Sequence, residues 1–365
     1  MKMKNTFAVF LLCIFCGNCG TLAAAVCIGT SVRAFGARGD GQTDDTMAIQ
    51  SAIDAAAAAG GGSVVFNVGR YFTTGTFIVP AGVVLCGGIE GSFDDASGVN
   101  PGVTTIAPTL LVTNTSAPFI SLNGVGAGVT DLLFHYPNQA HASASSPVAY
   151  PYTIVANASG TKVLRSMTTN AYNFLDIESG RVIAQDLFIG AYNIGVNIDH
   201  AHDHVTLRNL LQTVFWDAWE ANYPSPIDAW VMNHGIALVV NRVDSLEVHD
   251  FNLFHRFAGI VITDSPDTAQ NPRCGYGSGS DINLDTVQYG ITVSSSAALG
   301  YVFTNVVIGS GAGGQAAVQV KAAGSLPPDV LVEGGSIRGS WALGPFPAAA
   351  TGNLTVANII GFDLP

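Results

Sequence analysis

The sequence predicts an all-β solenoid, in which the chain winds into coils that stack along one axis. From residue 161 onward, short β-branched strands recur at spacings mostly in the low twenties, without helical patterning. Only 11% of the 365 residues are charged and 42 are glycine, whereas an average protein has about 25% charged residues. A stack of coils explains both features, because its interior is apolar and its tight bends need glycine or asparagine.

The composition also excludes two classes of protein. Hydrophobic residues make up 48% of the chain, which is too much apolar material for a disordered protein. Fourteen basic and 26 acidic residues give a net charge of −12. A nucleic-acid partner is not expected, because phosphate binding needs a basic face.

The N-terminus has the pattern of a secretory signal. Lysines at positions 2 and 4 precede an apolar run over Phe7–Phe15, and Ala23–Ala25 supplies small residues for cleavage. Residues 1–25 are therefore predicted to be a cleaved signal peptide, and the mature protein to be extracellular or periplasmic without a membrane segment. Lipoprotein processing at Cys27 and an uncleaved anchor are the alternatives.

Three cysteines, Cys27, Cys86 and Cys274, follow the predicted signal. An odd number excludes a complete set of disulfides within one chain. One disulfide with one buried thiol is allowed, and so are three buried thiols.

A helix and two strands are predicted next. Asp44, Asp45 and Thr46 can cap exposed N–H groups at the start of the helix. One apolar stripe follows, and glycines 60–62 end the helix. The stripe consists of Ala48, Ile49, Ala52, Ile53 and Ala56. Strands are expected at Ser63–Val68 and Phe72–Val79.

This segment resembles the N-terminal motif of the pectate-lyase-like superfamily, particularly its rhamnogalacturonase and polygalacturonase-related branch. The run 35–46, F-G-A-R-G-D-G-Q-T-D-D-T, and the run 60–66, G-G-G-S-V-V-F, carry the resemblance. The resemblance implies a single-stranded right-handed parallel β-helix with an N-terminal α-helical cap. The cap segment would span 26–62 and the β-helix 63–365. Asp40, Asp44 and Asp45 are expected to have turn and cap roles rather than to bind a metal.

Eight later strands are predicted at Lys162–Met167, Arg181–Leu187, His204–Leu210, Ser245–Asn252, Asp281–Val287, Tyr301–Val307, Asp329–Gly334 and Asn353–Ile359. Aligned positions within them are separated by 19, 23, 41, 36, 20, 28 and 24 residues. The two long steps predict one additional coil each, with His234–Val240 and Gly259–Thr263 as the missing strands. About ten coils, each adding about 4.8 Å, would give a rod near 50 Å long.

Functional residues are expected between 197 and 264, where six of the eight histidines and three of the four tryptophans fall. Residues 215–233 break the strand pattern and predict a loop, with Pro224 and Pro226 preventing regular pairing. Its aromatic rings could bind sugar rings or pack the loop onto the rod. The predicted substrate-binding residues are Asn197, Trp216, Trp219, Tyr223, Trp230, His255 and Arg256.

The polygalacturonase pattern matches in part. Its N-x-D is similar to 197–199, its aspartate pair to Trp216-Asp217, and its G-H-G to 233–235. Its R-I-K corresponds to 261–263, where both cations are missing. The resemblance implies Asp199 as the base and His234 as a substrate or orienting contact. Asp217 beside tryptophans would be desolvated, which would raise its pKa and suit a general acid.

The leading functional prediction is a glycoside hydrolase that cleaves a polysaccharide with a carboxylate acid and base. The alternatives are a non-catalytic glycan-binding or surface-structural β-helix, and a polysaccharide lyase or uronate epimerase on the same fold. His200, His202 and His204 alternate and could ligate zinc, but a solvated outer face is the favoured interpretation. No cofactor is therefore predicted, and calcium enters only with the lyase alternative.

Overall fold

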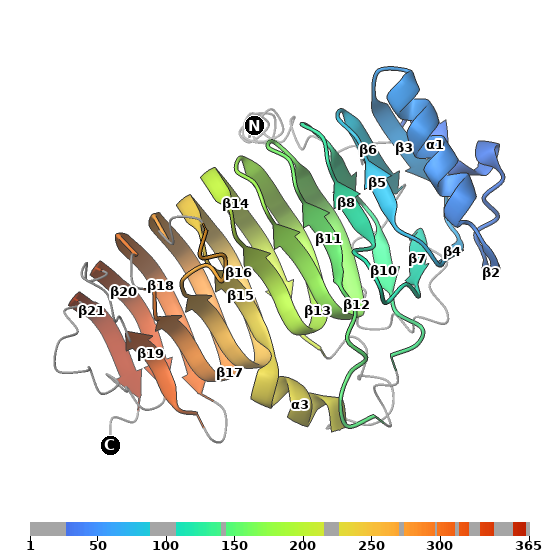
Figure 1. Ribbon diagram of the computed structural model, residues 1–365. Coiled ribbons are helices and arrows are strands. Elements are labelled where there is room, and N and C mark those ends of the chain that lie inside the picture. The colour runs from blue at the N-terminus through green and yellow to red at the C-terminus, as the bar shows by residue number, and fades with distance from the viewer. Residues whose placement is uncertain are drawn as a thin grey trace, which may run out of the picture.

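The computed structural model describes residues 27–87, 107–139, 144–214, 226–269, 274–295, 298–310, 314–320, 329–338 and 353–362. These residues form parallel strands that pair coil upon coil into an elongated stack, with the N-terminal strands and the only long helix at one end (Figure 1). Each coil has three segments, called here the first, middle and third segments in chain order. The predicted all-β fold is confirmed.

The first segments belong to twelve strands that pair in succession, all in parallel. From β12 onward, most of these strands continue around a corner into later segments of the coil. The strands are β1 (Gly29–Ser31), β3 (Gly62–Phe66), β6 (Val83–Gly87), β9 (Gly128–Thr130), β12 (Lys162–Ile177), β13 (Val182–Ile198), β14 (Ala201–Gln212), β16 (Val243–Ile262), β17 (Tyr276–Val293), β18 (Gly300–Ser310), β20 (Asp329–Arg338) and β21 (Asn353–Phe362).

Shorter strands complete the middle and third segments. They are β2 (Asp40–Asp44), β4 (Arg70–Thr73), β5 (Phe77–Val79), β7 (Thr109–Val112), β8 (Ile120–Leu122), β10 (Leu133–His135), β11 (Tyr152–Ala156), β15 (Ile236–Val240) and β19 (Ala316–Val320). The helices are the 3₁₀-helix η1 (Val32–Phe35), α1 (Thr46–Ala58) and α3 (Pro226–His234). β1 lies within the predicted cap segment, and it pairs with β3, which begins at the predicted boundary, residue 62.

The predicted N-terminal helix is present as α1, and it packs on β1, β3, β5 and β6. Its buried face is the predicted stripe except for Ala48, which is only partly buried. Asp44 accepts a hydrogen bond from the N–H of Thr46, whereas Asp45 accepts from the N–H groups of Arg38 and Gly39. Asp40 accepts from the backbone two and three residues ahead, and these bonds lower its pKa to about 2. Asp40 and Asp44 therefore have the predicted turn and cap roles, whereas Asp45 does not cap α1 with its side chain and instead holds the preceding turn at 38–39.

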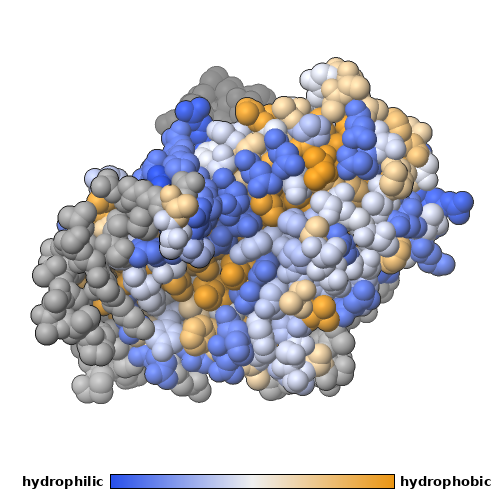
Figure 2. All heavy atoms as spheres, in the orientation of Figure 1, coloured by the Kyte–Doolittle hydropathy of each residue, from blue (hydrophilic) through white to orange (hydrophobic). Residues whose placement is uncertain are grey.

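The interior of the stack consists of rows of apolar side chains, one from each coil. One row of first segments is buried throughout: Val64, Leu85, Val129, Val163, Ala184, Leu207 and Val248. Neighbouring positions on the same strands point outward, and hydrophilic and hydrophobic residues are therefore interspersed on the visible surface (Figure 2). This is the alternation that the sequence predicts at 205–210.

The corner between the first and middle segments repeats with the same backbone conformation. One residue in each of nine successive coils has a φ between 39° and 70°, in the left-handed region. These residues are Asp131, Arg165, Asp186, Asn209, Asp250, Asp281, Asn305, Gly334 and Asn358. Asparagine and aspartate tolerate this conformation better than most residues, and their side chains also join neighbouring coils. Asn209 Nδ2, for example, donates to Asp186 Oδ1 over 2.8 Å.

Replacing Asn209 tests the importance of this corner. Asn209→Ala should lower the free energy of unfolding by about 1–2 kcal/mol, because alanine resists the left-handed conformation. Asn209→Gly should lose less, since glycine adopts positive φ freely. Chemical denaturation measures both, and Arg208→Ala, next to the corner, is the control. Equal losses for the alanine and glycine variants would contradict the explanation.

The two additional coils predicted from the long steps are absent from the described residues. Val205 pairs directly with Leu246, and Phe251 with Ile282, so each long step is one coil with a longer connection. The strand predicted at His234–Val240 is the third segment β15, which begins at Ile236, and His234 instead ends α3. Gly259–Thr263 likewise belongs to the third segment of β16 up to Ile262. The prediction was wrong because strand propensity does not distinguish a new coil from another side of the same coil.

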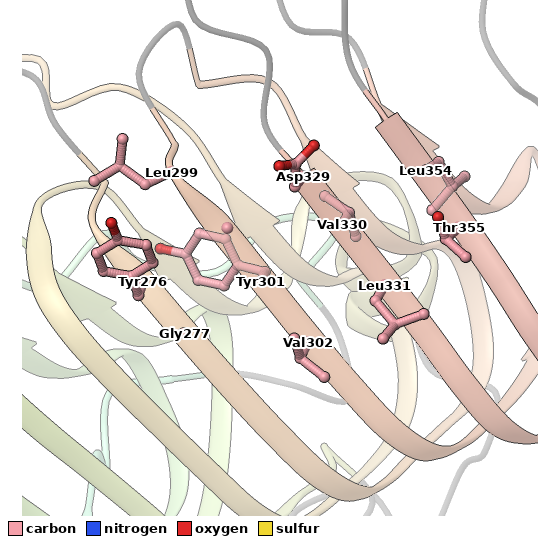
Figure 3. Close-up of a pocket in the computed structure, with 11 residues that line it drawn as sticks. Tyr276, Gly277, Leu299, Tyr301, Val302, Asp329, Val330, Leu331, Leu354 and Thr355 are labelled. Carbon is pink, nitrogen blue, oxygen red and sulfur yellow. The ribbon is translucent and has the colours of Figure 1, made fainter.

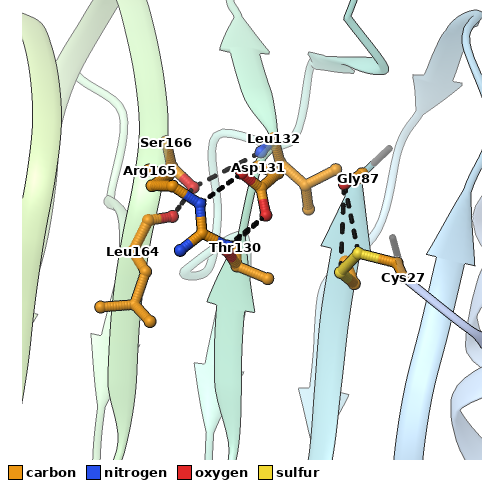
Figure 4. Close-up of a disulfide and its surroundings, with 9 residues drawn as sticks. Cys27, Gly87, Thr130, Asp131, Leu132, Leu164, Arg165 and Ser166 are labelled. Carbon is orange, nitrogen blue, oxygen red and sulfur yellow. Dashed lines mark hydrogen bonds and ion pairs between the residues drawn. A yellow bond between two sulfur atoms is a disulfide. The ribbon is translucent and has the colours of Figure 1, made fainter. Parts of the chain in front are cut away.

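The cysteines take one of the two arrangements that the sequence allows. Cys27 and Cys86 form a disulfide with a Cα–Cα distance of 6.1 Å, which ties the start of the described chain to β6 (Figure 4). Next to the disulfide, Arg165 makes a bidentate ion pair with Asp131 at the corner. Cys274 is a buried free thiol, and burial raises its pKa to about 12.

The predicted signal peptide lies outside the described residues, as does the segment 215–225 of the predicted loop. The part of that loop that is described is not irregular, because residues 226–234 form α3. Within the described chain, none of the helices has the length and apolar character needed to cross a membrane.

Candidate functional site

Two polar side chains lie next to each other in one row of the third segments. Asp176 on β12 and Asn197 on β13 are register partners, and the valines at 155 and 239 flank them in the same row. Asn197 Nδ2 donates to Asp176 Oδ1 over 2.7 Å, and Asn197 Oδ1 accepts from Asn241 Nδ2 over 3.0 Å. The hydrogen bond from Asn241 orients the Asn197 amide, and Asn197 in turn keeps Asp176 Oδ1 as an acceptor. The other oxygen is the one that can carry a proton.

The environment of Asp176 favours its protonated form. Burial, together with the negative charges of Glu178 and Asp199, outweighs the hydrogen bond from Asn197 and raises the pKa of Asp176 to about 7. A hydrogen bond with the Glu178 side chain contributes to this rise. A carboxyl group that is substantially protonated at neutral pH can donate a proton to a substrate.

His200 joins three carboxylates at the end of the third segments. Its Nδ1 lies 2.6 Å from Glu178 Oε2, and its Nε2 lies 3.1 Å from Asp267 Oδ2. Burial alone would lower the pKa of His200, but the hydrogen bonds to Glu178 and Asp267 and the charge of Asp199 raise it. The backbone of His200 is left-handed, with φ 51°, which directs the ring between the carboxylates of separate coils.

Asp199, the predicted base, is almost fully buried, with 3% of its surface exposed. Its Oδ1 accepts from the backbone N–H of His200, and its Oδ2 accepts from Ser265 Oγ, both over 2.8 Å. Because both oxygens are bonded within the protein, Asp199 is placed to position His200 and Ser265.

The His200 contacts make stability depend on pH. A raised folded-state pKa stabilises the fold fully below the ordinary value of 6.5, and this contribution is lost as pH rises through the raised pKa. Asparagine tolerates the left-handed backbone of residue 200. The His200→Asn variant should therefore be less stable than wild type, by a difference in free energy of unfolding that is largest below pH 6.5 and shrinks at alkaline pH. Thermal unfolding from pH 5.5 to 9 measures the difference, and a constant difference across that range would be the contrary result.

A second group of predicted residues lies at the start of the third segments, where α3 packs on β13 and β16. Trp230 stacks on His234 with ring centroids 4.4 Å apart, and it lies 5.9 Å from Tyr172. His234 Nδ1 also bonds to the carbonyl of Trp230 over 2.8 Å. His234 is exposed and Trp230 is half-buried, so these rings are accessible.

His255 and Arg256 lie beneath this surface. Burial lowers the pKa of His255, which the charge of Asp228 opposes. Arg256 is fully buried, its pKa is lowered to about 9, and its Nη1 donates to the carbonyl of Tyr192. Its Nε and Nη2 have no hydrogen-bond partner among the described residues. Arg256 is therefore not exposed to a substrate in this conformation, and the two ring nitrogens of the half-buried His255 are themselves buried.

The remaining predicted residues, Trp216, Asp217, Trp219 and Tyr223, lie outside the described residues. Their proposed roles stay predictions. Asp176, Glu178 and Asp267 were not predicted from the sequence. Residues 176–178 (D-I-E) stand one coil before 197–199 (N-I-D), so alignment of the third segments would have revealed the first two.

The arrangement does not fit a calcium ion, because the ring of His200 occupies the space between the carboxylates. Of the histidines predicted to alternate on one face, His200 precedes β14 and bonds to carboxylates, while His204 lies on the strand itself. Across the described ranges, the only group of three or more metal-type ligand residues within 4.8 Å of one another is Cys27, Cys86 and Asp131. Two of these three residues are joined in the disulfide.

The chain matches the family described as rhamnogalacturonase A/epimerase, pectate lyase-like, over residues 29–222. It is 60% identical over 45 residues to alginate lyase 7 of Azotobacter vinelandii, covering 12% of this chain and 5% of that protein. It is 46% identical over 59 residues to a probable glucan endo-1,3-beta-glucosidase of Arthroderma benhamiae, covering 16% and 6%. The chain thus spans only a small part of these curated relatives.

Among solved structures, the tailspike protein of E. coli bacteriophage HK620, in complex with a pentasaccharide, aligns with a TM-score of 0.52. The alignment covers 91% of this chain and 65% of the tailspike chain at 10% identity. At that identity the likeness concerns the fold alone.

Proposed function

Because the chain belongs to the rhamnogalacturonase A/epimerase family of pectate-lyase-like proteins, we propose that it is a secreted glycoside hydrolase that cleaves a neutral polysaccharide. The observation that carries the proposal is the carboxyl group of Asp176, whose pKa is raised to about 7 beside a second carboxylate. Glycoside hydrolysis needs one protonated and one ionised carboxyl group close to the scissile bond.

Asp176 takes the role of general acid. Its proton passes to the glycosidic oxygen as the bond to the sugar carbon breaks, so the leaving sugar departs as a neutral alcohol. Glu178 hydrogen-bonds to Asp176, closer than the separation of about 5–9.5 Å between the two working carboxyl groups of glycosidases, so its role is to hold the proton on Asp176. His200 orients Glu178 over 2.6 Å. Asp199 positions His200 by accepting a hydrogen bond from its backbone N–H. Asp217, predicted as the acid from the sequence, stays a candidate second carboxylate.

The aromatic rings of Trp230, Tyr172 and His234 supply a surface on which a sugar ring can stack. Tyr172 and Asp176 lie on the same strand, four residues apart, which is about 13 Å along the chain. Asn173 and Asn193 lie close to Tyr172, and Asn193 Nδ2 donates to Asn173 Oδ1 over 2.9 Å. Their half-buried amides can bind sugar hydroxyls between the rings and the acid.

The charge of the site favours a neutral substrate. Asp176, Glu178, Asp199 and Asp267 gather around one histidine, and the chain has a net charge of −12. A polyuronate would be repelled by this field unless cations that the described site lacks were supplied.

Two finer structural features belong to the same proposal. Right-handed winding of a single chain is expected, because parallel strand connections are right-handed in about 98% of cases, and α1 would close the N-terminal end. The disulfide between Cys27 and Cys86 supports export to an oxidising compartment, and with it the predicted signal peptide.

A lyase or epimerase that acts on a uronate is the second candidate. Tyr152 favours it, because this half-buried phenol lies close enough to Asp176 and Glu178 for their charges to raise its pKa, in addition to the effect of burial. A phenol beside carboxyl groups can relay a proton to or from a sugar carbon.

The proposal is tested with a panel of neutral polysaccharides, alginate and polygalacturonate. New reducing ends from a neutral polymer, without an unsaturated product, are the expected result. Ultraviolet absorbance of an unsaturated uronate would indicate a lyase, and inversion at C5 seen by NMR would indicate an epimerase. Binding without any product would indicate the non-catalytic alternative. Each of these three outcomes would overturn the hydrolase assignment.

A further inference from the structure

A groove of about 770 Å³ lies on the outer face of the first segments in the C-terminal coils. It is on a different side of the stack from Asp176. It crosses β17, β18, β20 and β21 near their starts (Figure 3). Its outward-pointing residues are Tyr276, Val302, Asp329, Leu331 and Thr355, and we call it the outer groove.

The outer groove combines an aromatic wall with an apolar floor. Tyr276 has 62% of its surface exposed, which is unusual for so large a ring on a strand face. Val302 is 41% exposed beside it, and Leu331 continues the floor on the next coil. Gly300 pairs with Tyr276 and leaves open space next to the ring.

Polar groups border this apolar floor. Asp329 follows Gly300 in the outward row, and Ser278 and Thr355 lie at the two ends of the row of Val302 and Leu331. All three are exposed. An apolar floor with a few polar groups at its edge is typical of a small-molecule or sugar site, whereas a protein or lipid contact would favour a larger continuous apolar patch.

The polar surface continues beyond the groove onto the preceding coils. Glu247 is the register partner of Ser278, and its Oε2 lies 3.6 Å from His204 Nε2 and 3.9 Å from His249 Nε2. Ser280 holds the other nitrogen of His249 over 2.9 Å. From β14 to β21, six strands thus present one face about 24 Å long at about 4.8 Å per strand.

We propose that this face binds a segment of a neutral, linear polysaccharide that lies along the axis of the stack. One sugar ring places its C–H face on Tyr276 over Gly300, and its hydroxyls reach Asp329 and Thr355. Further rings follow toward Glu247 and the two histidines. The carboxylates of Asp329 and Glu247 on this face disfavour an anionic polymer. The inference shares its ligand class with the proposed function, but it rests on a separate site that could hold the polymer while another part of it is cut.

The test measures binding in affinity gels that contain soluble β-glucan, xylan or galactomannan, with polygalacturonate as the anionic comparison. The protein carries Asp176→Asn, so that no polymer is cut. Tyr276→Ala should weaken retardation by at least one neutral polymer about tenfold, while Tyr276→Phe should keep most of it because the ring remains.

Gly300→Val is a second variant, which should weaken binding by filling the groove rather than by removing the ring. Gly300 does not have a positive φ, and a Cβ there would lie 3.7 Å from the carbonyl oxygen of Asp329 and 3.8 Å from the Tyr276 ring. The larger side chain should therefore fill the groove without straining the backbone, and it should weaken binding as Tyr276→Ala does. Phe254→Ala, which removes a ring that is 36% exposed outside the groove, should change nothing.

Unchanged retardation of the Tyr276→Ala and Gly300→Val proteins would overturn the proposal, and so would the absence of binding to every neutral polymer. Self-association of the wild type that Tyr276→Ala abolishes would assign the groove to a second copy of the chain instead. Cleavage assays on short oligosaccharides with Tyr276→Ala in the otherwise native protein keep this question apart from catalysis. The outer groove fails if binding does not depend on it, whereas the proposed function fails if no bond is cut.

Discussion

Asp176→Asn should reduce kcat for polysaccharide hydrolysis by about 10²–10⁴-fold, the usual contribution of a general acid. The amide has the shape of the protonated carboxyl group, so it can still accept the hydrogen bond from Asn197 and donate to Glu178. It cannot give up a proton to the glycosidic oxygen. Initial rates of reducing-end release measure the loss, and an unchanged melting temperature shows that the fold persists.

The same assignment fixes the sign of the pH dependence. Asp176 acts only when protonated, so activity should fall as pH rises through about 7, the value to which burial and neighbouring carboxylates raise its pKa. Asp186→Asn is the matched control, because Asp186 accepts a hydrogen bond at the corner on another side of the coil. If Asp176→Asn kept more than a tenth of wild-type activity, or if the alkaline limb were absent, Asp176 would not be the acid.

Removing the disulfide should give the largest loss of stability. Cys27 and Cys86 are 59 residues apart in sequence, and the chain-entropy model assigns about 4 kcal/mol to closing a loop of that size. The double variant Cys27→Ser, Cys86→Ser should therefore unfold at lower denaturant concentration than wild type. A reducing agent should produce a similar shift in the wild-type protein.

Cys274→Ala supplies the control for this experiment. Its thiol is buried and free, so the variant changes packing but should keep the sensitivity to reducing agent. The double cysteine-to-serine variant should lose that sensitivity. Equal stability of the wild-type protein with and without reducing agent would contradict a stabilising disulfide.

Local sequence rules were sufficient to predict those elements whose formation depends on one short segment of the chain. The helix α1 begins beside Asp44 and Asp45 and ends at glycines 60–62, because capping groups, an apolar stripe and a helix-ending turn follow one another in the chain. The coils were recognisable for the same reason, since each repeats an inward and outward alternation. The number of coils was not, because the connections before β15 and after β16 lengthen two of them without adding a strand to the first-segment row.

The site shows the same division. Asn197 and Asp199 were found because they lie in a recognisable motif, and the structure brings both to the carboxyl cluster. Asp267 comes from a turn 67 residues away from its partner His200 in sequence. Trp230 and His234 come together on a helix where a loop was predicted. The Trp230–His234 contact follows once the helix is known, because residues four apart lie on one helix face. No local pattern could place Asp267 beside His200 or Tyr172 beside Trp230.

The amino-acid order alone determined that this chain winds into β-coils behind an N-terminal helix, because hydrophobic alternation and helix capping act between close neighbours. Only the tertiary structure decided which carboxyl group holds a proton at neutral pH. A pKa depends on the burial and charge of everything within a few ångströms. In a stack of coils, those neighbours are supplied by residues about one coil length away in the sequence, as Asn197 and Asp199 are for Asp176.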